Sequence, residues 1–571
     1  VSDGKIVEIM EAERYFRQKR YKLHCLNLNP GKQKSGYQYV DISELELFLG
    51  FVGKKWGKVY DHLAVQNQGR QEEYQNLLTL LANHGFKFGE KYNVNHHLSH
   101  AALSFYTSVF DDAVILSYDG FGNDGVTVVF HGNNDIQYIG NSDIRFGQAY
   151  NNLGYIIGVS PDIAGSTAGK TMGLAAYGSV YNEWLPYARK YIRKYRKLIP
   201  HNVEGLNNFG KAHRINSVGL DEIPELKKFV RKVKYPGKGF MGKLLQKTGL
   251  GIKHKELVLP GPEDKISQSL MHMVQLAWTE EVLDLLKKYK DVSNNICVVG
   301  GCALNGITNY AIEKSGMFKN AYFVPNPSDC GVSAGAALYV NHKFGKITFS
   351  GAKDYFSPYL GVEPFDLNEL PAFKEKFSWK EFSPDALPKI LAKLIYSDKI
   401  VGVIRGRYEV GPRALGNRSI LCNPLNKNMR DILNQKVKHR EWYRPFAPVV
   451  AAEDSHKYFT NSTDIPYMSV ICYTRKEYIA LLPSITHIDG SARVQTIKRP
   501  DNQFLYDTIK EFEKLSGFPI ILNTSFNPRG EPILNFCAVG LDMLNNTDMD
   551  LVLIENTLFF RKGREELLRH E

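Results

Sequence analysis

Short apolar segments that end at glycines alternate with amphipathic segments in the first part of this 571-residue chain, and this alternation limits its fold most. Strands are expected at AVILSYD (113–119), VTVVFHG (126–132) and NICVVGG (295–301). Helices are expected at 96–109, 263–289 and 329–344, the second with apolar residues at i, i+3, i+4 and i+7. Together they predict an α/β fold of layered sheets with helices on both faces.

The alternation breaks between residues 347 and 378, where prolines and glycines interrupt a weak periodicity, so we expect a linker there. A second α/β unit should follow, with strands at 400–406, 467–473 and 518–524. The predicted domains are therefore residues 1–346, with a basic insertion at about 187–256, and residues 379–571.

The composition is that of a water-soluble globular protein, with 43% hydrophobic and 23% charged residues. No run of about 18 apolar residues occurs, so we expect neither a membrane span nor a membrane partner. The seven cysteines are scattered and form no CxxC pair, which favours the reducing cytoplasm. The chain begins at Val1, and IVEIM (6–10) after SDG reads as the second strand of a hairpin whose first strand we expect to be missing.

Basic residues concentrate in one segment. From Arg189 to Lys255 there are 18 Lys and Arg against 4 acidic residues, whereas the whole chain carries a net charge of +12. A solvated helical face is the ordinary explanation of such a run. Clustering this strong also favours a polyanionic partner, because Lys and Arg gain affinity by releasing phosphate counterions. Tyr and Phe are interleaved, as in KYIRKYRK and KKFVRKVK, which suits a nucleic acid.

Two histidines and two acids form a candidate metal site. His96 and His100 lie at i and i+4, so on a helix their Cβ atoms are about 5–6 Å apart on one face. Two imidazoles in that arrangement can reach one metal ion at about 2.0–2.1 Å. Asp119 ends a strand, and Asp329 begins a glycine-rich helix. A histidine pair alone more often serves packing, but two carboxylates at element edges favour a metal.

Two glycine-rich segments are candidate phosphate cradles. VVGGCALNG (298–306) reads as a strand, a turn and a helix start, where backbone amides can approach a phosphate closely. AGKTMGLAAYG (168–178) is similar. A glycine pair at a strand end is more often a plain turn, so neither segment decides by itself.

The second half contains cations with few acidic neighbours, and these indicate an anion site. A buried cation without a counter-charge requires an anion, and Arg can bind phosphate or carboxylate through two N–H groups. Surface salt bridges are the alternative explanation. Ser525 and Asn523 end a predicted strand, where a hydroxyl and an amide can bind phosphate oxygens. The cations are Arg413, Arg418, Lys438, Arg440, Arg444 and Arg493.

These motifs, in their order along the chain, resemble those of the NodU/CmcH family of O-carbamoyltransferases. The first-half blocks are NHHLSHA, SYDGFGNDG, MGLAAYG, VVGGCALN and NPSDCGVSAGAA. The second-half blocks are GRYEVGPRALGNRSILCNP, LNQKVKHREWYRPFAPVV, SARVQTI and LNTSFNPRGEPI. The resemblance implies a Kae1-like first domain of the actin/hexokinase type and a YrdC-like second domain.

The resemblance also implies a reaction. The second domain would form carbamoyl-adenylate from carbamoyl phosphate and ATP with Mg²⁺, and the first domain would transfer the carbamoyl group to a hydroxyl. The implied catalytic residues are Arg413, Lys438, Arg444, Arg493 and Ser525, and the implied metal ligands are His96, His100, Asp119 and Asp329. The implied cofactor-binding residues are Gly300, Gly301, Asn305, Lys19, Arg418 and Asn523. Iron(II) is the expected metal, and manganese or zinc would also suit these ligands.

The sequence departs from the family pattern in two places. Family members begin with a further strand that carries a His-Asp pair, and this sequence starts after it, so the base for the acceptor hydroxyl stays unassigned. AGKTMGLAAYG also lacks an acid that family members often have before its lysine.

The acceptor is inferred from the basic segment. It leads us to expect DNA, and by analogy with family members that modify phage DNA the hydroxyl of 5-hydroxymethylcytosine. A small natural product or sugar, the usual acceptor in the family, and tRNA threonylcarbamoyl modification are the alternatives. A sugar-kinase-like ATPase would leave residues 400–535 without a role, and a non-enzymatic nucleic-acid-binding protein would explain only the charge. A homodimer is also considered.

Overall fold

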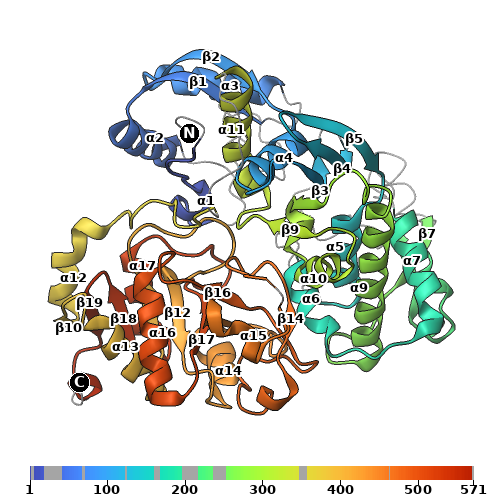
Figure 1. Ribbon diagram of the computed structural model, residues 1–571. Coiled ribbons are helices and arrows are strands. Elements are labelled where there is room, and N and C mark those ends of the chain that lie inside the picture. The colour runs from blue at the N-terminus through green and yellow to red at the C-terminus, as the bar shows by residue number, and fades with distance from the viewer. Residues whose placement is uncertain are drawn as a thin grey trace. The chain divides into compact units, whose positions relative to one another are not determined.

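The computed structural model describes residues 1, 5–18, 42–66, 71–122, 125–159, 167–195, 217–235, 252–345, 356–461 and 463–568 (Figure 1). The chain divides into two compact units. Among the described residues, the larger contains 1–141 and 289–568, and the smaller contains 142–288.

A five-stranded sheet forms the first half of the larger unit, in the order β5-β4-β3-β8-β9. The central strand β3 pairs antiparallel with β4 and parallel with β8, and β8 pairs parallel with β9. Ala113 to Leu116 of β3 are fully buried, as expected for a central strand covered on both faces. The strands are β3 (Ala113–Gly122), β4 (Gly125–Gly132), β5 (Ile136–Ser142), β8 (Asn295–Val299) and β9 (Asn320–Phe323).

Two closely packed helices, α4 (His96–Tyr106) and α11 (Val332–Phe344), accompany this sheet. A Cβ atom at Gly335 of α11 would lie 1.9 Å from the carbonyl oxygen of Ser99 on α4, so this approach requires glycine. The same half also contains α2 (Ile42–Trp56), α3 (Gln71–Asn83) and α10 (Gly306–Lys314), and the parallel pair β1 (Val59–Val65) and β2 (Lys87–Asn93).

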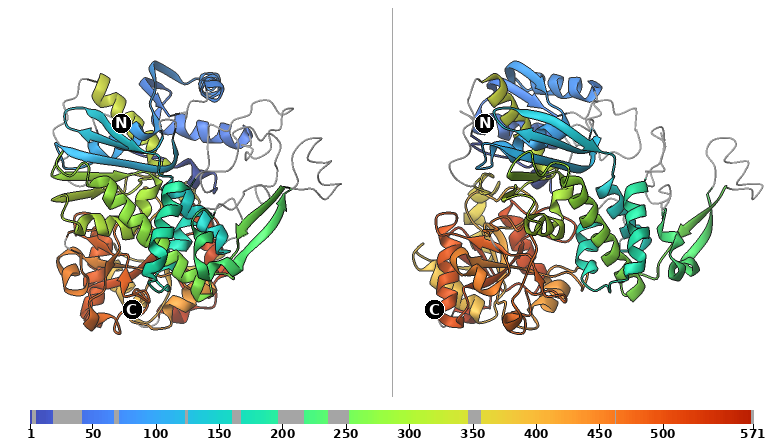
Figure 2. Two further views of the ribbon diagram at one scale, coloured as in Figure 1. Left: turned by 90° about the vertical axis from the view of Figure 1, so that its right-hand side faces the viewer. Right: turned by 45° about the vertical axis from the view of Figure 1, so that its right-hand side comes forward.

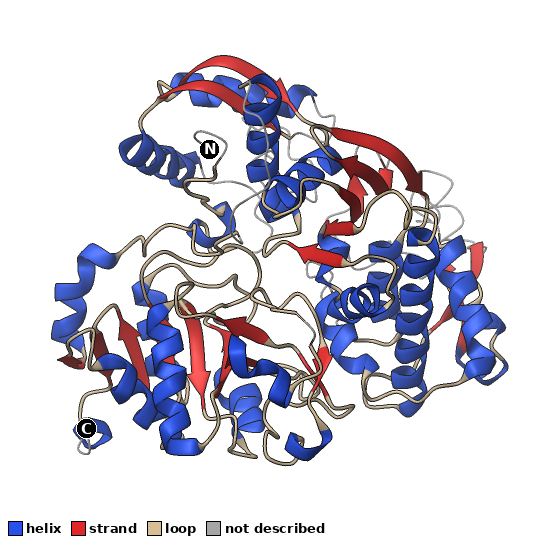
Figure 3. Ribbon diagram, viewed as in Figure 1, coloured by secondary structure: helices blue, strands red, loops and turns tan. Residues whose placement is uncertain are grey.

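An eight-stranded sheet forms the second half of the larger unit, in the order β10-β19-β18-β11-β12-β17-β13-β16. Helices α13 (Leu387–Tyr396) and α16 (Gln503–Ser516) pack together beside it, and their apolar residues share a core with β11 and β18 (Figure 3). The strands are β10 (Ser378–Glu381), β11 (Val401–Ile404), β12 (Arg418–Cys422), β13 (Ala447–Ala451), β16 (Gln495–Ile497), β17 (Ile520–Ser525), β18 (Leu551–Ile554) and β19 (Thr557–Phe560).

Helices build the core of the smaller unit. Its helices are α5 (Phe146–Ile156), α6 (Ala168–Ala175), α7 (Leu185–Lys194) and α9 (Lys265–Leu286), and its hairpin pairs β6 (Val230–Tyr235) with β7 (Ile252–Leu257). Arg189 of α7 bonds to Glu280, Glu281 and Asp284 of α9 at 3.1, 2.5 and 2.5 Å. The hairpin extends away from the helices of this unit (Figure 2).

The α/β prediction is confirmed, but three local predictions are wrong. Ile6 to Met10 form no strand, because Ile9 donates its N–H to the carbonyl of Leu360 in a non-strand segment. The predicted strand 467–473 is reduced to β14 (Cys472–Tyr473). The predicted glycine loop at 168–178 is mostly the helix α6, and Gly178 allows close packing because its Cβ would lie 2.3 Å from the Gln268 carbonyl.

The linker at 347–378 and the domain limits stay predictions. The described part of that stretch contains the helix α12 (Leu370–Lys376). No helix in the described ranges combines the length and the apolar character that crossing a bilayer requires.

Candidate active site

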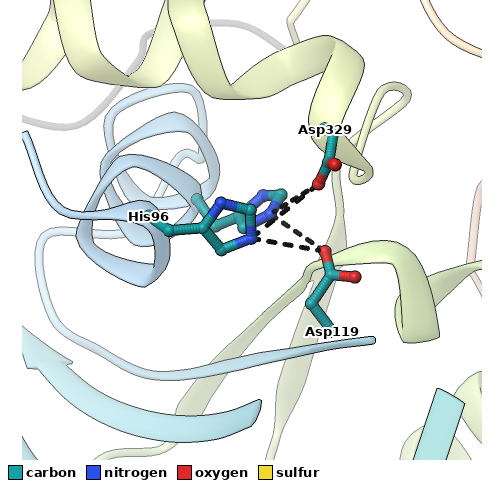
Figure 4. A group of neighbouring side chains, drawn as sticks. His96, Asp119 and Asp329 are labelled. Carbon is teal, nitrogen blue, oxygen red and sulfur yellow. Dashed lines mark hydrogen bonds and ion pairs between the residues drawn. The ribbon is translucent and has the colours of Figure 1, made fainter. Parts of the chain in front are cut away.

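Four side chains from separate elements converge beside the five-stranded sheet. His96 and His100 come from the first turns of α4, Asp119 from β3, and Asp329 from the turn before α11 (Figure 4). Each offers one ligand atom, and these atoms all lie within 4.8 Å of one another. Nε2 of His100 lies 3.1 Å from Oδ2 of Asp119 and 3.9 Å from Oδ1 of Asp329. For His96 Nε2 the same two distances are 3.7 and 3.8 Å.

This donor set fits a divalent transition metal. Both imidazoles are fully buried, whereas the Asp329 side chain is 56% exposed, so the cluster opens on the Asp329 side. Nitrogen and carboxylate donors in equal number suit iron, manganese and zinc. Burial alone raises the pKa of Asp119, but the hydrogen bond from His100 and the nearby imidazole of His96 outweigh it, so that pKa lies well below its usual value. A metal ligand must be deprotonated, and Asp119 meets that requirement.

The glycine turn after β8 holds Asp119 in place. Gly301 donates its N–H to Oδ2 of Asp119 at 2.9 Å. Gly300 has a φ of +94°, and a Cβ there would lie 2.2 Å from the carbonyl oxygen of Tyr118, so only glycine fits. Asn305, at the end of the same turn, caps α10 by accepting the N–H of Thr308 at 3.2 Å. The turn predicted as a phosphate cradle therefore also supports a candidate metal ligand.

The third histidine lies outside this cluster. His97 contacts the hydroxyl of Ser117 through Nδ1 at 2.8 Å and the carbonyl of Gly125 through Nε2 at 3.2 Å. These contacts tie α4 to β3 and β4, so His97 supports the element that carries the other two imidazoles.

The second half gathers arginines whose positive charges face one another. The pKa of Arg413 is lowered to about 10 by burial and then by the charge of Arg444. Burial, then Arg413 and Arg444, lowers the pKa of Arg493 well below its usual value. The pKa of Arg440 is lowered in the same way, by burial and then by Arg444. An anion placed among Arg413, Arg444 and Arg493 would relieve this repulsion.

Two other predicted cations have every N–H occupied by the protein. Arg418 is fully buried and gives its five N–H groups to the carbonyls of Arg405, Gly406 and Asn417 and twice to Oδ1 of Asn535, at 2.8–3.1 Å. Its pKa is lowered to about 10, mainly by burial. Lys438 donates to the carbonyls of Ser525 and Asn527 and to Oδ1 of Asn527, each at 2.8 Å. In this structure both residues hold loops, and a direct contact with a ligand stays a prediction.

The end of β17 offers acceptor and donor groups to a ligand. Asn523 donates to the carbonyl of Ala414 at 3.0 Å and to Oε1 of Gln495 at 2.9 Å, and its own Oδ1 is buried without a hydrogen-bond partner in the described part of the chain. Ser525 donates its hydroxyl to Oδ1 of Asn527 at 2.7 Å. Gln495 and Asn527 were not predicted, although Asn527 belongs to the quoted block LNTSFNPRGEPI.

A pocket joins structure from both halves of the larger unit. Arg413 contributes to it from the second half, and the segment that leads to Asp329 contributes Pro325 and Pro327. Its remaining lining residues are Ala303, Leu304, Val324, Tyr467, Met468 and Ser469. Arg413, one member of the arginine cluster, and the loop before Asp329 thus border one space. Lys19, also predicted to bind a cofactor, lies outside the described residues.

Comparison with known proteins matches both halves of the chain to one family. A family profile described as Carbamoyltransferase N-terminus matches residues 58–338, and one described as Carbamoyltransferase C-terminus matches residues 392–561. Uncharacterized protein sll1178 of Synechocystis sp. is 30% identical over 513 residues, which cover 82% of this chain and 76% of that protein. Nodulation protein NolNO of Sinorhizobium fredii is 29% identical over 592 residues, 98% of this chain and 78% of that protein.

The chain is a carbamoyltransferase of the NodU/CmcH family. It is therefore a transferase enzyme, as the motifs predicted. Full-length HypF in the phosphate- and nucleotide-bound form aligns with a TM-score of 0.26 at 13% identity, over 52% of this chain and 49% of that one. That similarity is too low to support an argument about this carbamoyltransferase.

Proposed function

We propose that this carbamoyltransferase makes carbamoyl-adenylate from carbamoyl phosphate and ATP in its second half and transfers the carbamoyl group to a hydroxyl in its first half. The observation that carries the proposal is the convergence of Arg413, Arg444 and Arg493, whose charges act on one another. Like charges held together where they are only partly exposed to solvent are unfavourable unless a ligand compensates them. Carbamoyl phosphate and the phosphates of ATP are ligands of the required charge.

The arginines would act by placing charge. Guanidinium groups bind phosphate oxygens through paired N–H groups and stabilise negative charge that develops during transfer. The hydroxyl of Ser525 and the unpartnered Oδ1 of Asn523 lie on the same strand end and would orient the bound group. Mg²⁺ would accompany the ATP phosphates.

The first half would hold a divalent metal, for which iron(II) is our expectation, with manganese and zinc as alternatives. His96, His100 and Asp119 would bind it from the buried side and Asp329 from the exposed side. When bound, such an ion polarises a carbonyl or phosphoryl oxygen. Gly301 would keep Asp119 oriented through its N–H, and Gly300 would allow the turn to approach the strand.

Pyrophosphate release tests the first step. The purified enzyme with ATP and carbamoyl phosphate should release pyrophosphate without any acceptor, because adenylate formation precedes transfer. Arg493→Met should reduce that rate by about 10²–10³-fold, the usual effect of removing one charge-stabilising donor. Arg499→Met is the matched control, because Arg499 is exposed and paired with Asp507 at 2.8 Å. The proposal would be contradicted if pyrophosphate were released at the same rate without carbamoyl phosphate, or if Arg493→Met released it at the wild-type rate.

We further propose that the acceptor is the hydroxymethyl group of 5-hydroxymethylcytosine in DNA, bound with help from the hairpin β6–β7. In this hairpin Lys232 pairs with Lys255 and Lys234 with Lys253. The segment from Arg189 to Lys255, to which this hairpin belongs, has 18 Lys and Arg against 4 acidic residues, and such clustering favours a polyanion because counterions are released on binding. An enzyme that acts on a base must also take it out of the stack, which requires a firm hold on the backbone.

The acceptor is tested by binding and by product mass. Duplex DNA should bind the wild type with an affinity that falls steeply as salt rises. The double variant Lys232→Glu and Lys234→Glu should bind more weakly and show a shallower salt dependence, while its acceptor-free pyrophosphate release stays at the wild-type level. Hydroxymethylated DNA should gain the mass of one carbamoyl group per modified base. Carbamoylation of a sugar or small natural product without DNA binding would instead support the alternative acceptor.

A further inference from the structure

A buried ion pair near the start of the chain is not explained by the sites described above. Glu11 precedes α1 (Ala12–Tyr15), and Oε2 of Glu11 accepts from Nε of Arg14 at 2.6 Å. The two side chains are only 2% and 1% exposed. Burying both charges has an energetic penalty that their attraction roughly offsets, so such a pair is a weak source of stability. A role in fixing a particular geometry explains it better.

The pair binds the backbone of one loop in the second half. Nη2 of Arg14 donates to the carbonyls of Glu409 and Gly411 at 2.7 and 3.0 Å, and Oε1 of Glu11 accepts the N–H of Gly411 at 2.8 Å. The guanidinium also lies 4.2 Å from the ring centre of Tyr408. Two side chains therefore hold three backbone groups that lie about 400 residues away in the sequence.

The loop so held carries Arg413. Gly411 has a φ of +94°, and a Cβ there would lie 2.4 Å from the carbonyl oxygen of Pro325, so the loop also presses against the segment that leads to Asp329. On its other side, the buried carboxylate of Glu409 accepts the N–H groups of Leu415 and Arg418 at 2.6 and 3.2 Å. Arg413 thus extends from a turn that is fixed at both ends.

Arg413 needs such a support because its neighbours repel it. The charge of Arg444 lowers the pKa of Arg413, and the charge of Arg413 lowers the pKa of Arg493. In the part of the chain that the structure describes, Arg413 has no hydrogen-bond or ion-pair partner to oppose that repulsion. The hydrogen-bonded backbone of its own loop therefore helps to keep it beside the other two arginines before an anion arrives.

We propose that Glu11 and Arg14 are positioning residues that hold the Arg413 loop in the geometry required to bind carbamoyl phosphate. The inference rests on the proposed adenylate-forming function of the arginine cluster. It assigns a role in that half-reaction to Glu11 and Arg14, neither of which is a member of the arginine cluster. Displacing a binding group by about 1 Å can reduce a rate by about 10²-fold, so a small loop shift is sufficient.

Chemical rescue tests the inference. Arg14→Ala should lower kcat/KM for carbamoyl phosphate, measured as pyrophosphate release, by about 100-fold, mainly through KM. Millimolar guanidinium should restore it, because the vacated space retains the Glu11 carboxylate and the two carbonyls of the loop. Methylammonium should not, since it cannot reach three acceptors in one plane. Arg17→Ala is the matched control, because Arg17 lies in the same segment but forms an exposed ion pair with Glu531 at 3.0 Å.

The outcomes separate this inference from the function on which it rests. If the wild type releases no pyrophosphate with carbamoyl phosphate, the proposed function fails. If the wild type releases pyrophosphate and Arg14→Ala releases it with the same kcat/KM, only the positioning role fails. The same holds if Arg14→Ala loses activity and guanidinium does not restore it. Should Arg14→Ala not fold, Arg14→Lys keeps the charge and loses the paired N–H groups, and it should show an intermediate rise in KM. An unchanged KM in Arg14→Lys would then overturn the inference.

Discussion

At the scale of the residue, the hydrogen bonds of each arginine distinguish those that support the fold from those that are available to bind a ligand. Arg413 and Arg418 lie five positions apart, and burial lowers the pKa of both to about 10. All five N–H groups of Arg418 bond to the protein, whereas Arg413 has no hydrogen-bond partner among the described residues. The sequence cannot separate them, because both are arginines in the single block GPRALGNRS, which contains no acidic residue.

Arg413→Met should therefore stabilise the free enzyme. A folded-state pKa of about 10, below the usual 12.5, means that folding disfavours the charged form. The penalty is fully present below pH 10 and disappears as the pH rises from 10 to 12.5. We expect the free energy of unfolding at neutral pH to rise by about 1–2 kcal/mol in urea denaturation.

Pyrophosphate should raise the melting temperature of the wild type but not of Arg413→Met, since only the wild type has the complete cluster. The exposed Arg499→Met should leave both measurements unchanged. A less stable Arg413→Met would show that Arg413 is held by contacts and is not a strained binding group.

At the scale of the element, the ends of strands place the candidate metal ligands. Asp119 lies near the carboxyl end of β3, and the turn after β8 donates the Gly301 N–H to it. Because β3 and β8 are parallel neighbours, their carboxyl ends meet at one edge of the sheet. The first turns of α4 bring His96 and His100 to the same place. Each ligand is thus positioned by a regular element or a turn beside it.

Gly300→Ala should weaken this site. The new Cβ would meet the Tyr118 carbonyl at 2.2 Å, and alanine at φ +94° is strained, so we expect a loss of about 1–3 kcal/mol in unfolding free energy. Weaker Co²⁺ binding, measured by visible absorption, should accompany the loss because the neighbouring Gly301 supports Asp119. Gly316→Ala is the matched control: its φ is +69°, but no atom lies within 4 Å of the new Cβ. Equal effects in both variants would exclude a steric contribution to the metal site.

At the scale of the whole molecule, the proposed reaction divides between two halves of one compact unit. A hydrophobic core shared by the halves includes Ala101 and Cys297 from the first and Tyr408 and Tyr467 from the second. The pocket that contains Arg413 and Pro325 is built by both halves as well. Carbamoyl-adenylate formation and carbamoyl transfer would therefore occur in one compact unit, but the first would depend on the arginine cluster and the second on the metal site.

Removing the metal should separate the two steps. After chelation we expect pyrophosphate release from ATP and carbamoyl phosphate to continue with Mg²⁺ resupplied, while carbamoyl transfer to the acceptor hydroxyl stops. Adding back iron(II) or manganese should restore transfer, and mass spectrometry of the acceptor measures it. If chelation stopped pyrophosphate release as well, the four-residue cluster would belong to activation and the proposed division would be wrong.

The sequence by itself determined what depends on neighbouring residues. The i, i+4 spacing placed His96 and His100 on one helical face, and the apolar run before Asp119 identified the buried strand β3, which in the structure continues to Gly122. The order of motifs along the chain identified the family. The sequence-based prediction failed where the local pattern was ambiguous, as in 168–178: this glycine-rich stretch, typical of a loop, is mostly the helix α6, and Gly178 after it packs against the Gln268 carbonyl.

Only the tertiary structure decided which of these residues have partners. The hydrogen bond of Arg14 with Gly411 joins positions 397 residues apart, and the sequence around neither residue predicts it. The same is true of Lys438, whose ammonium is bound by the carbonyl of Ser525, the last residue of β17, and by that of Asn527. Helix and strand periodicity are properties of adjacent residues, whereas hydrogen-bond satisfaction and charge repulsion depend on which distant segments packing brings within a few ångströms.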